Sequence, residues 1–106
     1  MSNLMYVLHE KGVYPEPDVL KWARWFNTAN RTIKRTTLSD GVVISTVFLG
    51  INHGTDETPL FFETMVFGGK HDGDMYRYSL YVEAEMNHDA IVKQLEDEEV
   101  EIERTS

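Results

Sequence analysis

Two apolar runs lie in the middle of the chain, and the rest of the chain is interpreted around them. Residues 42–51 (VVISTVFLGI) and 60–69 (LFFETMVFGG) are apolar at most positions, and the polar segment 52–59 (NHGTDETP) separates them. Alternate side chains of a strand point to opposite faces, so each run presents two mostly apolar faces. Such strands need cover on both faces. The pattern predicts the two central strands of a sheet, and a homodimer would supply a layer that the chain itself lacks.

The residues before this pair predict a helix and an edge strand. After Pro17, apolar residues recur at helical spacing from Asp18 to Thr28, which is typical of an amphipathic helix. Residues 31–38 (RTIKRTTL) are β-branched and polar, as in an exposed or edge strand. The sequence Ser39-Asp40-Gly41 favours a tight turn between antiparallel strands.

The residues after the pair predict a further strand and a second helix. Residues 75–81 (MYRYSLY) alternate as in a half-buried strand, and from Val82 to about Asp97 the apolar period becomes helical. Residues 96–103 hold the acidic run EDEEVEIE, whose charges repel one another and the carboxyl end of the helix dipole. We therefore expect one domain of residues 1–95, followed by an acidic tail of residues 96–106 that is mobile or only marginally helical.

The amino-terminal residues are ambiguous. Residues 4–8 (LMYVL) fit either a short strand or an apolar plug, and Gly12 with the Pro15-Glu16-Pro17 cluster is expected to interrupt regular structure. The predicted fold class is α+β: an antiparallel meander of about four strands, with one helix before it and one helix after it.

Length and composition limit the class of protein to which the chain can belong. A chain of 106 residues with 42% hydrophobic residues fits one globular domain, and without cysteine it has no disulfide and no thiolate metal site. No signal peptide and no stretch near 18 apolar residues is present. These features predict a cytoplasmic protein without a membrane partner.

Charge is segregated along the chain. The net charge is −8, and residues 82–106 carry nine acids against two bases, which is −7 of that total. Acidic proteins repel nucleic acid at long range, which argues against a nucleic-acid partner. Five basic residues without an intervening acid form a positively charged segment, which we call the basic stretch: Lys21, Arg24, Arg31, Lys34 and Arg35.

These charges and one tryptophan are the candidate interaction residues. Trp25 lies beside the main apolar stripe of the first helix, so it either widens the core face or is an exposed anchor for a partner. The tail, including Glu98 and Glu99, could dock on the basic stretch in the same chain or in a dimer mate, imitate nucleic-acid charge, or simply aid solubility.

Histidines and turn carboxylates raise the question of a metal. In a meander, His53 and the 68–74 loop lie at opposite ends of the sheet, about 20 Å apart or more. A site at the second end would have oxygen-rich ligands suited to a hard cation, although a solvated turn explains the same residues. The candidate ligands are Asp40, His71, Asp72 and Asp74. No cofactor-binding motif is present.

Glu63 and His88 are the candidates for catalysis. Glu63 lies among Phe and Met residues on a central strand, where a carboxyl acquires a raised pKa or a partner such as Arg35, Arg77 or Tyr78. His88 lies on the apolar stripe of the last helix, where it is either a hydrogen-bonded core residue or a catalytic group.

Several segments resemble a known group of proteins. They are residues 41–53 (GVVISTVFLGINH), residues 59–69 (PLFFETMVFGG), Arg77-Tyr78, and Ala84 with His88. The chain resembles, over residues 20–95, small uncharacterised proteins of tailed bacteriophages and prophages. The resemblance implies a phage setting and no particular reaction. Ser79-Leu80-Tyr81 and the acidic tail depart from that pattern, so a role for the tail would be particular to this chain.

Two classes of function follow. The first is a non-enzymatic phage accessory protein that binds a host or viral protein through an exposed face. The second is a small hydrolase or metal-assisted enzyme that uses Glu63 with His53 or His88. The test that separates them is whether Glu63 and a histidine meet in an open pocket.

Overall fold

The computed structural model describes residues 3–105. Its main sheet has four antiparallel strands in the order β3-β4-β5-β6, and a separate two-stranded sheet pairs β1 with β2. The elements are β1 (Tyr6–His9), β2 (Gly12–Pro15), α1 (Val19–Thr28), β3 (Thr32–Thr37), β4 (Val43–Phe48), β5 (Phe62–Phe67), β6 (Met75–Tyr78) and α2 (Tyr81–Thr105). The predicted α+β class and the four-stranded antiparallel meander are confirmed.

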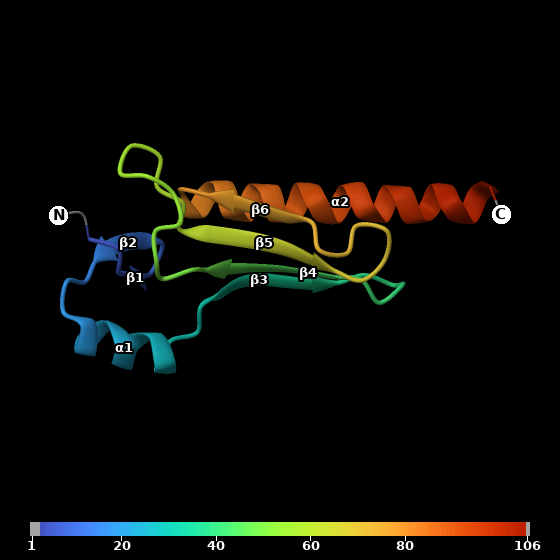
Figure 1. Ribbon diagram of the computed structural model, residues 1–106. Coiled ribbons are helices and arrows are strands. Elements are labelled where there is room, and N and C mark those ends of the chain that lie inside the picture. The colour runs from blue at the N-terminus through green and yellow to red at the C-terminus, as the bar shows by residue number, and fades with distance from the viewer. Residues whose placement is uncertain (1–2, 106) are drawn as a thin grey trace.

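Helix α2 covers one face of the main sheet and runs along its whole length (Figure 1). The alternation of β4 places Ile44 and Phe48 on this face, and both are fully buried. Phe62 and Val66 of β5 join them in the core, and Ala84 of α2 packs against the two phenylalanines. The two apolar runs are therefore the central strands, as the pattern predicted.

Helix α1 and the β1–β2 hairpin lie together at one end of the sheet (Figure 1). Asp18 caps α1, because its Oδ1 accepts hydrogen bonds from the backbone N–H groups of Leu20 (3.0 Å) and Lys21 (3.2 Å). The Trp22 indole donates to the carbonyls of Tyr6 (3.1 Å) and Gly50 (3.0 Å) and so joins the helix to both sheets. Gly50 has φ +78°, and a Cβ there would lie 2.9 Å from the Phe26 ring, so this junction requires glycine.

Trp25 belongs to the core face of α1. Its ring packs edge-on against Phe48, with 5.7 Å between the ring centroids, and the side chain is only partly exposed. Of the two interpretations of Trp25, the structure favours the wide core face over the exposed anchor.

The amino-terminal hairpin corrects one expectation. Residues 6–9 form β1, and Gly12–Pro15, expected to be irregular, form β2 with Tyr6 opposite Pro15. Proline is tolerated there because it ends an edge strand. The reversal between the strands uses Glu10 in a left-handed conformation, φ 56°, a turn that the sequence did not signal.

Helix α2 corrects a second expectation. It begins at Tyr81 and continues to Thr105, so the predicted boundary at residues 95/96 falls inside a helix. Pairs one turn apart hold the acidic segment in the helix, Lys93 with Asp97 (3.3 Å) and Gln94 with Glu98 (3.4 Å). The side chains of residues 102–105, and the whole of residue 106 at the end of the predicted tail, lie outside the described residues.

Between residues 3 and 105, no helix combines the length and the apolar character that crossing a membrane would require.

Candidate functional site

No element within residues 3–105 covers the sheet face opposite α2, and we call it the open face. Strand register places its members side by side: Val43 opposite Phe67, Ser45 opposite Met65, and Val47 opposite Glu63. The outer strands extend it, with Arg35 opposite Ser45 on β3, and with Met75 and Arg77 on β6 opposite Met65 and Glu63. The open face comprises Arg35, Val43, Ser45, Val47, Glu63, Met65, Phe67, Met75 and Arg77.

The apolar residues of the open face, five of its nine members, are partly or largely accessible. Phe67 is 48% exposed and Met75 is 44% exposed, whereas Val43, Val47 and Met65 are half-buried. The same strands bury their other face completely at Ile44, Phe48 and Phe62. The described part of the chain thus supplies one of the two layers that the sequence pattern requires.

Glu63 lies on this face and is paired. The Arg77 Nε donates to Glu63 Oε2 at 3.1 Å, and the Glu63 side chain is 15% exposed. Arg77 was one of the three partners that the sequence suggested. The carboxylate is thus held as half of an ion pair between two neighbouring strands.

The structure does not bring Glu63 to either candidate histidine. His88 projects from α2 into the covered face of the sheet, opposite to the face that carries Glu63. His53 lies in the 52–59 connector and is exposed. Buried Asn52 organises that connector by accepting hydrogen bonds from Gly54 N (2.8 Å) and Leu60 N (3.0 Å). The enzyme hypothesis therefore lacks the shared pocket that it needed.

His88 belongs to a buried polar network. Its Nδ1 is 2.7 Å from Thr46 Oγ1, its Nε2 is 2.8 Å from Thr36 Oγ1, and Thr46 Oγ1 is 2.5 Å from Thr64 Oγ1. The histidine is fully buried, and loss of hydration lowers its pKa, so the ring is neutral near pH 7. Neutral imidazole offers one donor and one acceptor, which the two hydroxyls match.

The four candidate metal ligands instead make separate contacts in the turns. Asp40 Oδ1 accepts from Val42 N (3.0 Å), and Asp72 Oδ1 accepts from Gly68 N (2.7 Å), so both carboxylates cap turns. His71 pairs with Asp74. Within the part of the chain that the structure describes, no three His, Cys, Asp or Glu side chains converge to hold a metal ion.

His71 instead connects the β5–β6 loop to α2. We call its pair with Glu98 the clasp. Its Nε2 is 2.8 Å from Glu98 Oε2, and its Nδ1 is 3.1 Å from Asp74 Oδ2. The hydrogen bond to Glu98, with a smaller contribution from Asp74, raises the pKa of His71, and the same bond lowers the pKa of Glu98. Sequence reasoning missed this contact because it ended the helix before Glu98.

The basic stretch does not form a single surface. Lys34 Nζ bonds Asp89 of α2 (2.5 Å), whereas its neighbour Arg35 points to the open face. Arg31 donates to the Phe48 carbonyl (2.9 Å) and lies over the Phe26 ring. Lys21 and Arg24 remain exposed on α1. The acidic segment contacts other residues, His71 through Glu98 and Ser39 through Glu99 (2.6 Å).

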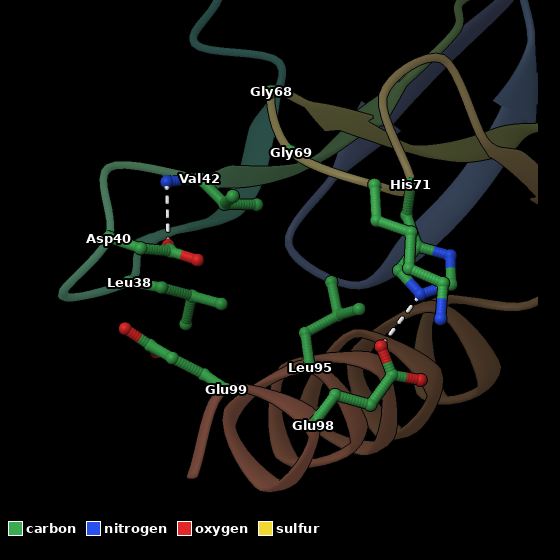
Figure 2. Close-up of a pocket in the computed structure, with 10 residues that line it drawn as sticks. Leu38, Asp40, Val42, Gly68, Gly69, His71, Leu95, Glu98 and Glu99 are labelled. Atoms are coloured by element: carbon green, nitrogen blue, oxygen red, sulfur yellow. Dashed lines mark hydrogen bonds and ion pairs between the residues drawn. The ribbon is translucent and has the colours of Figure 1, made fainter. Parts of the chain in front are cut away.

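A pocket lies at the end of the sheet away from α1. It is enclosed by the β3–β4 turn, the β5–β6 loop and α2, and its volume is about 320 Å³. Figure 2 shows His71 and Glu98 on one side of it and Asp40 and Glu99 on the other. The open face and this pocket are two accessible features of the part of the chain that the structure describes.

Comparison with protein-family models, with curated proteins and with solved structures finds no match to this chain.

Proposed function

We propose that the protein is a non-enzymatic bacteriophage accessory protein that binds another protein, host or viral, in the cytoplasm of the bacterial host. The observation that carries the proposal is the open face, an accessible apolar surface on the two central strands. The phage setting rests on the resemblance of residues 41–53 and 59–69.

The size and composition of the open face suit a protein partner. Four strands of about six residues span roughly 15 Å by 20 Å, on the order of 300 Å², which is the size of patches that mark binding sites on monomeric proteins. Phenylalanine, methionine and arginine are enriched in such interfaces. Because the residues lie on paired strands, the surface is preformed and loses little conformational entropy on binding.

The charged residues of the open face indicate which kind of protein surface can bind there. The pair of Glu63 with Arg77 is internally neutral, whereas Arg35 takes part in no ion pair among residues 3–101, whose side chains the structure describes. A partner that buries Arg35 has to supply a carboxylate, since an unpaired buried cation is costly. We therefore infer a partner surface that is apolar, with an acidic residue at the position that meets Arg35.

Capture from bacterial lysate with matched variants tests the proposal. Phe67→Glu and Arg35→Glu each place a charge on the open face, and Met86→Glu places the same charge on the exposed side of α2, where Met86 is 67% exposed. The expected result is a partner retained by the parent protein and by Met86→Glu but lost with both open-face variants. Circular dichroism verifies that all four proteins are folded.

Two results would contradict the proposal. One is a partner that binds the open-face variants and the parent protein equally, which places the interaction elsewhere. The other is a parent protein that is a stable dimer by light scattering, becomes monomeric with Phe67→Glu, and captures no other protein. In that case a second copy covers the open face.

A further inference from the structure

The pocket beside His71 has an apolar floor. Its lining includes Leu38, Val42 and Leu95, whose exposed fractions are 6%, 9% and 9%. Figure 2 shows these three side chains pointing into the space between the turns and α2. A volume of about 320 Å³ is at the lower end of the range for sites that bind small molecules. The floor can therefore hold a short aliphatic stem.

Carboxylates line the side of the pocket away from His71. Asp40 uses Oδ1 to accept the Val42 N–H at 3.0 Å, and Glu99 uses Oε1 to accept the Ser39 hydroxyl at 2.6 Å. Among the described residues, no hydrogen bond uses the second oxygen of either carboxylate. Both groups thus keep an acceptor for a ligand while their orientation is fixed by the turn.

On the opposite side of the pocket, the charges of His71 and Glu98 compensate each other. His71 and Glu98 pair at 2.8 Å, which leaves Lys70 as the other basic residue of the lining. Lys70 and Asp40 are both exposed, so water screens both charges. The lining holds the carboxylates of Asp40, Glu98 and Glu99 against Lys70 and His71, so its net charge is negative even when His71 is protonated.

Glycine keeps the loop close to the floor. Gly69 has φ +70°, and a Cβ at this position would lie 2.9 Å from Val42 Cγ2. A side chain there would both strain the backbone and press on the floor of the pocket. The shape of the pocket thus depends on a specific residue of the β5–β6 loop.

We propose that this pocket binds an organic cation, an ammonium group on a short aliphatic stem. The stem lies on Leu38, Val42 and Leu95, and the ammonium is bound by Asp40 and Glu99. An anion would be repelled by these carboxylates, and a neutral apolar molecule would desolvate them without compensation. The site is separate from the open face and independent of the function proposed for it.

Two sources can supply this chemistry, a free alkylamine or a lysine side chain of a protein. Hexylamine represents the first, and a short peptide with one central lysine between alanines, blocked at both ends, represents the second. Tighter binding of the peptide assigns the natural ligand to a protein. Tighter binding of hexylamine assigns it to a small molecule.

The experiment is a titration followed by amide NMR shifts. Hexylamine added up to about 50 mM should shift the amides of Gly68, Gly69 and Leu95 saturably, with a dissociation constant in about the millimolar range for so small a ligand. Hexanol and hexanoate have the same stem without the positive charge. They should leave these amides unshifted or shift them without saturation.

Isosteric variants test the two carboxylates. Asp40→Asn and Glu99→Gln keep the oxygens that accept from Val42 and Ser39 but remove the charge. Each should raise the dissociation constant for hexylamine by about threefold to tenfold. Asp97→Asn removes a carboxylate of the same helix that pairs with Lys93 outside the pocket lining, and it should change nothing.

Three results would overturn the inference. The first is the absence of saturable shifts at the pocket amides with both amines. The second is hexanol binding as tightly as hexylamine. The third is unchanged hexylamine binding in the variant that combines Asp40→Asn with Glu99→Gln.

Discussion

His88 shows how one side chain ties five elements together. It reaches from α2 between β3 and β4, and the threonine that it contacts on β4 contacts Thr64 on β5. Tyr78 of β6 is hydrogen-bonded to the same Thr64, and burial raises the pKa of that tyrosine. A buried network of this kind is stabilising only while every member has a partner.

The change His88→Leu should therefore destabilise the protein although it preserves apolar volume. Thr36 and Thr46 would each lose the hydrogen bond to His88, which predicts a loss of about 2–3 kcal/mol in the free energy of unfolding. The control Met86→Leu, at an exposed position of the same helix, should stay within about 0.5 kcal/mol of the parent. Urea melts measure both, and a loss below about 1 kcal/mol for His88→Leu would contradict the role of the network.

The clasp of His71 and Glu98 predicts a pH dependence. The pKa of His71 is raised above 6.5, so its contribution is complete below pH 6.5 and is lost as pH rises through the folded-state pKa. The pKa of Glu98 is lowered below 4.5, so its contribution is complete above pH 4.5 and is lost as pH falls through the folded-state pKa. The clasp is therefore at full strength between pH 4.5 and 6.5.

Thermal melts of the parent and of His71→Asn across pH test this behaviour. Because the pKa of buried His88 is lowered, acidification below pH 6.5 destabilises both proteins alike. Their difference isolates His71. The gap in melting temperature should be largest at about pH 5.5 and should shrink at about pH 9. A gap that is constant over this range would show that the charge of His71 does not matter.

The sequence pointed to the residues of the candidate sites but predicted only some of their contacts. For Glu63 the sequence suggested Arg35, Arg77 or Tyr78 as the partner, and the structure shows that it is Arg77. The contacts of His88 were not predicted, although Thr46 and Thr64 stand out as polar residues on otherwise buried faces. The clasp of His71 with Glu98 joins residues 27 positions apart, and it requires knowing how far α2 extends.

The two central strands differ sharply between their faces. Phe48 and Phe62 are fully buried under α2, and their rings lie 5.4 Å apart, whereas Phe67 is on the open face. This asymmetry predicts that aromatic residues of similar size make unequal contributions to stability.

Alanine substitutions measure the asymmetry. Phe48→Ala and Phe62→Ala should each cost about 3–5 kcal/mol, as expected for buried aromatic residues. Phe67→Ala should cost about 1 kcal/mol because its side chain is half-exposed. Urea melts provide the values, and equal losses at all three positions would mean that the open face is buried in the isolated protein.

Helix α2 extends past the predicted end of the domain. Glu98 and Glu99 attach its acidic segment to the β5–β6 loop and to the β3–β4 turn. Truncation after Leu95 removes both contacts and should cost about 1–2 kcal/mol, since exposed pairs contribute up to about 1 kcal/mol each. Truncation after Glu101 leaves both contacts and should cost less than about 0.5 kcal/mol. Equal effects of the two truncations in urea melts would contradict the docking of this segment.

Elements with a strong local signal were predictable and those without one were not. Asp18 at the start of α1 and Ser39-Asp40-Gly41 between β3 and β4 carry local signals, and both elements form as expected. The β1–β2 hairpin depends on a left-handed Glu10 and on the backbone bridge between Met5 and Ile51, which are tertiary effects. The continuation of α2 depends on partners in distant turns that offset the repulsion between its acids.

The molecule as a whole is a sheet covered on one side. Helix α2 covers one face, and α1 and the first hairpin lie at one end (Figure 1). The second apolar face, evident in the alternation of both central strands, has no cover within residues 3–105. A protein partner on the open face would complete the two-sided burial that the sequence pattern predicts.

Photo-crosslinking from the open face tests this claim most directly. A benzoylphenylalanine in place of Phe67 is irradiated in bacterial cells that produce the protein, and the same group in place of exposed Met86 on α2 is the control. We predict a covalent adduct with a different protein from position 67 and none from position 86. An adduct of this chain with itself, no adduct at position 67, or the same adduct from both positions would contradict the account.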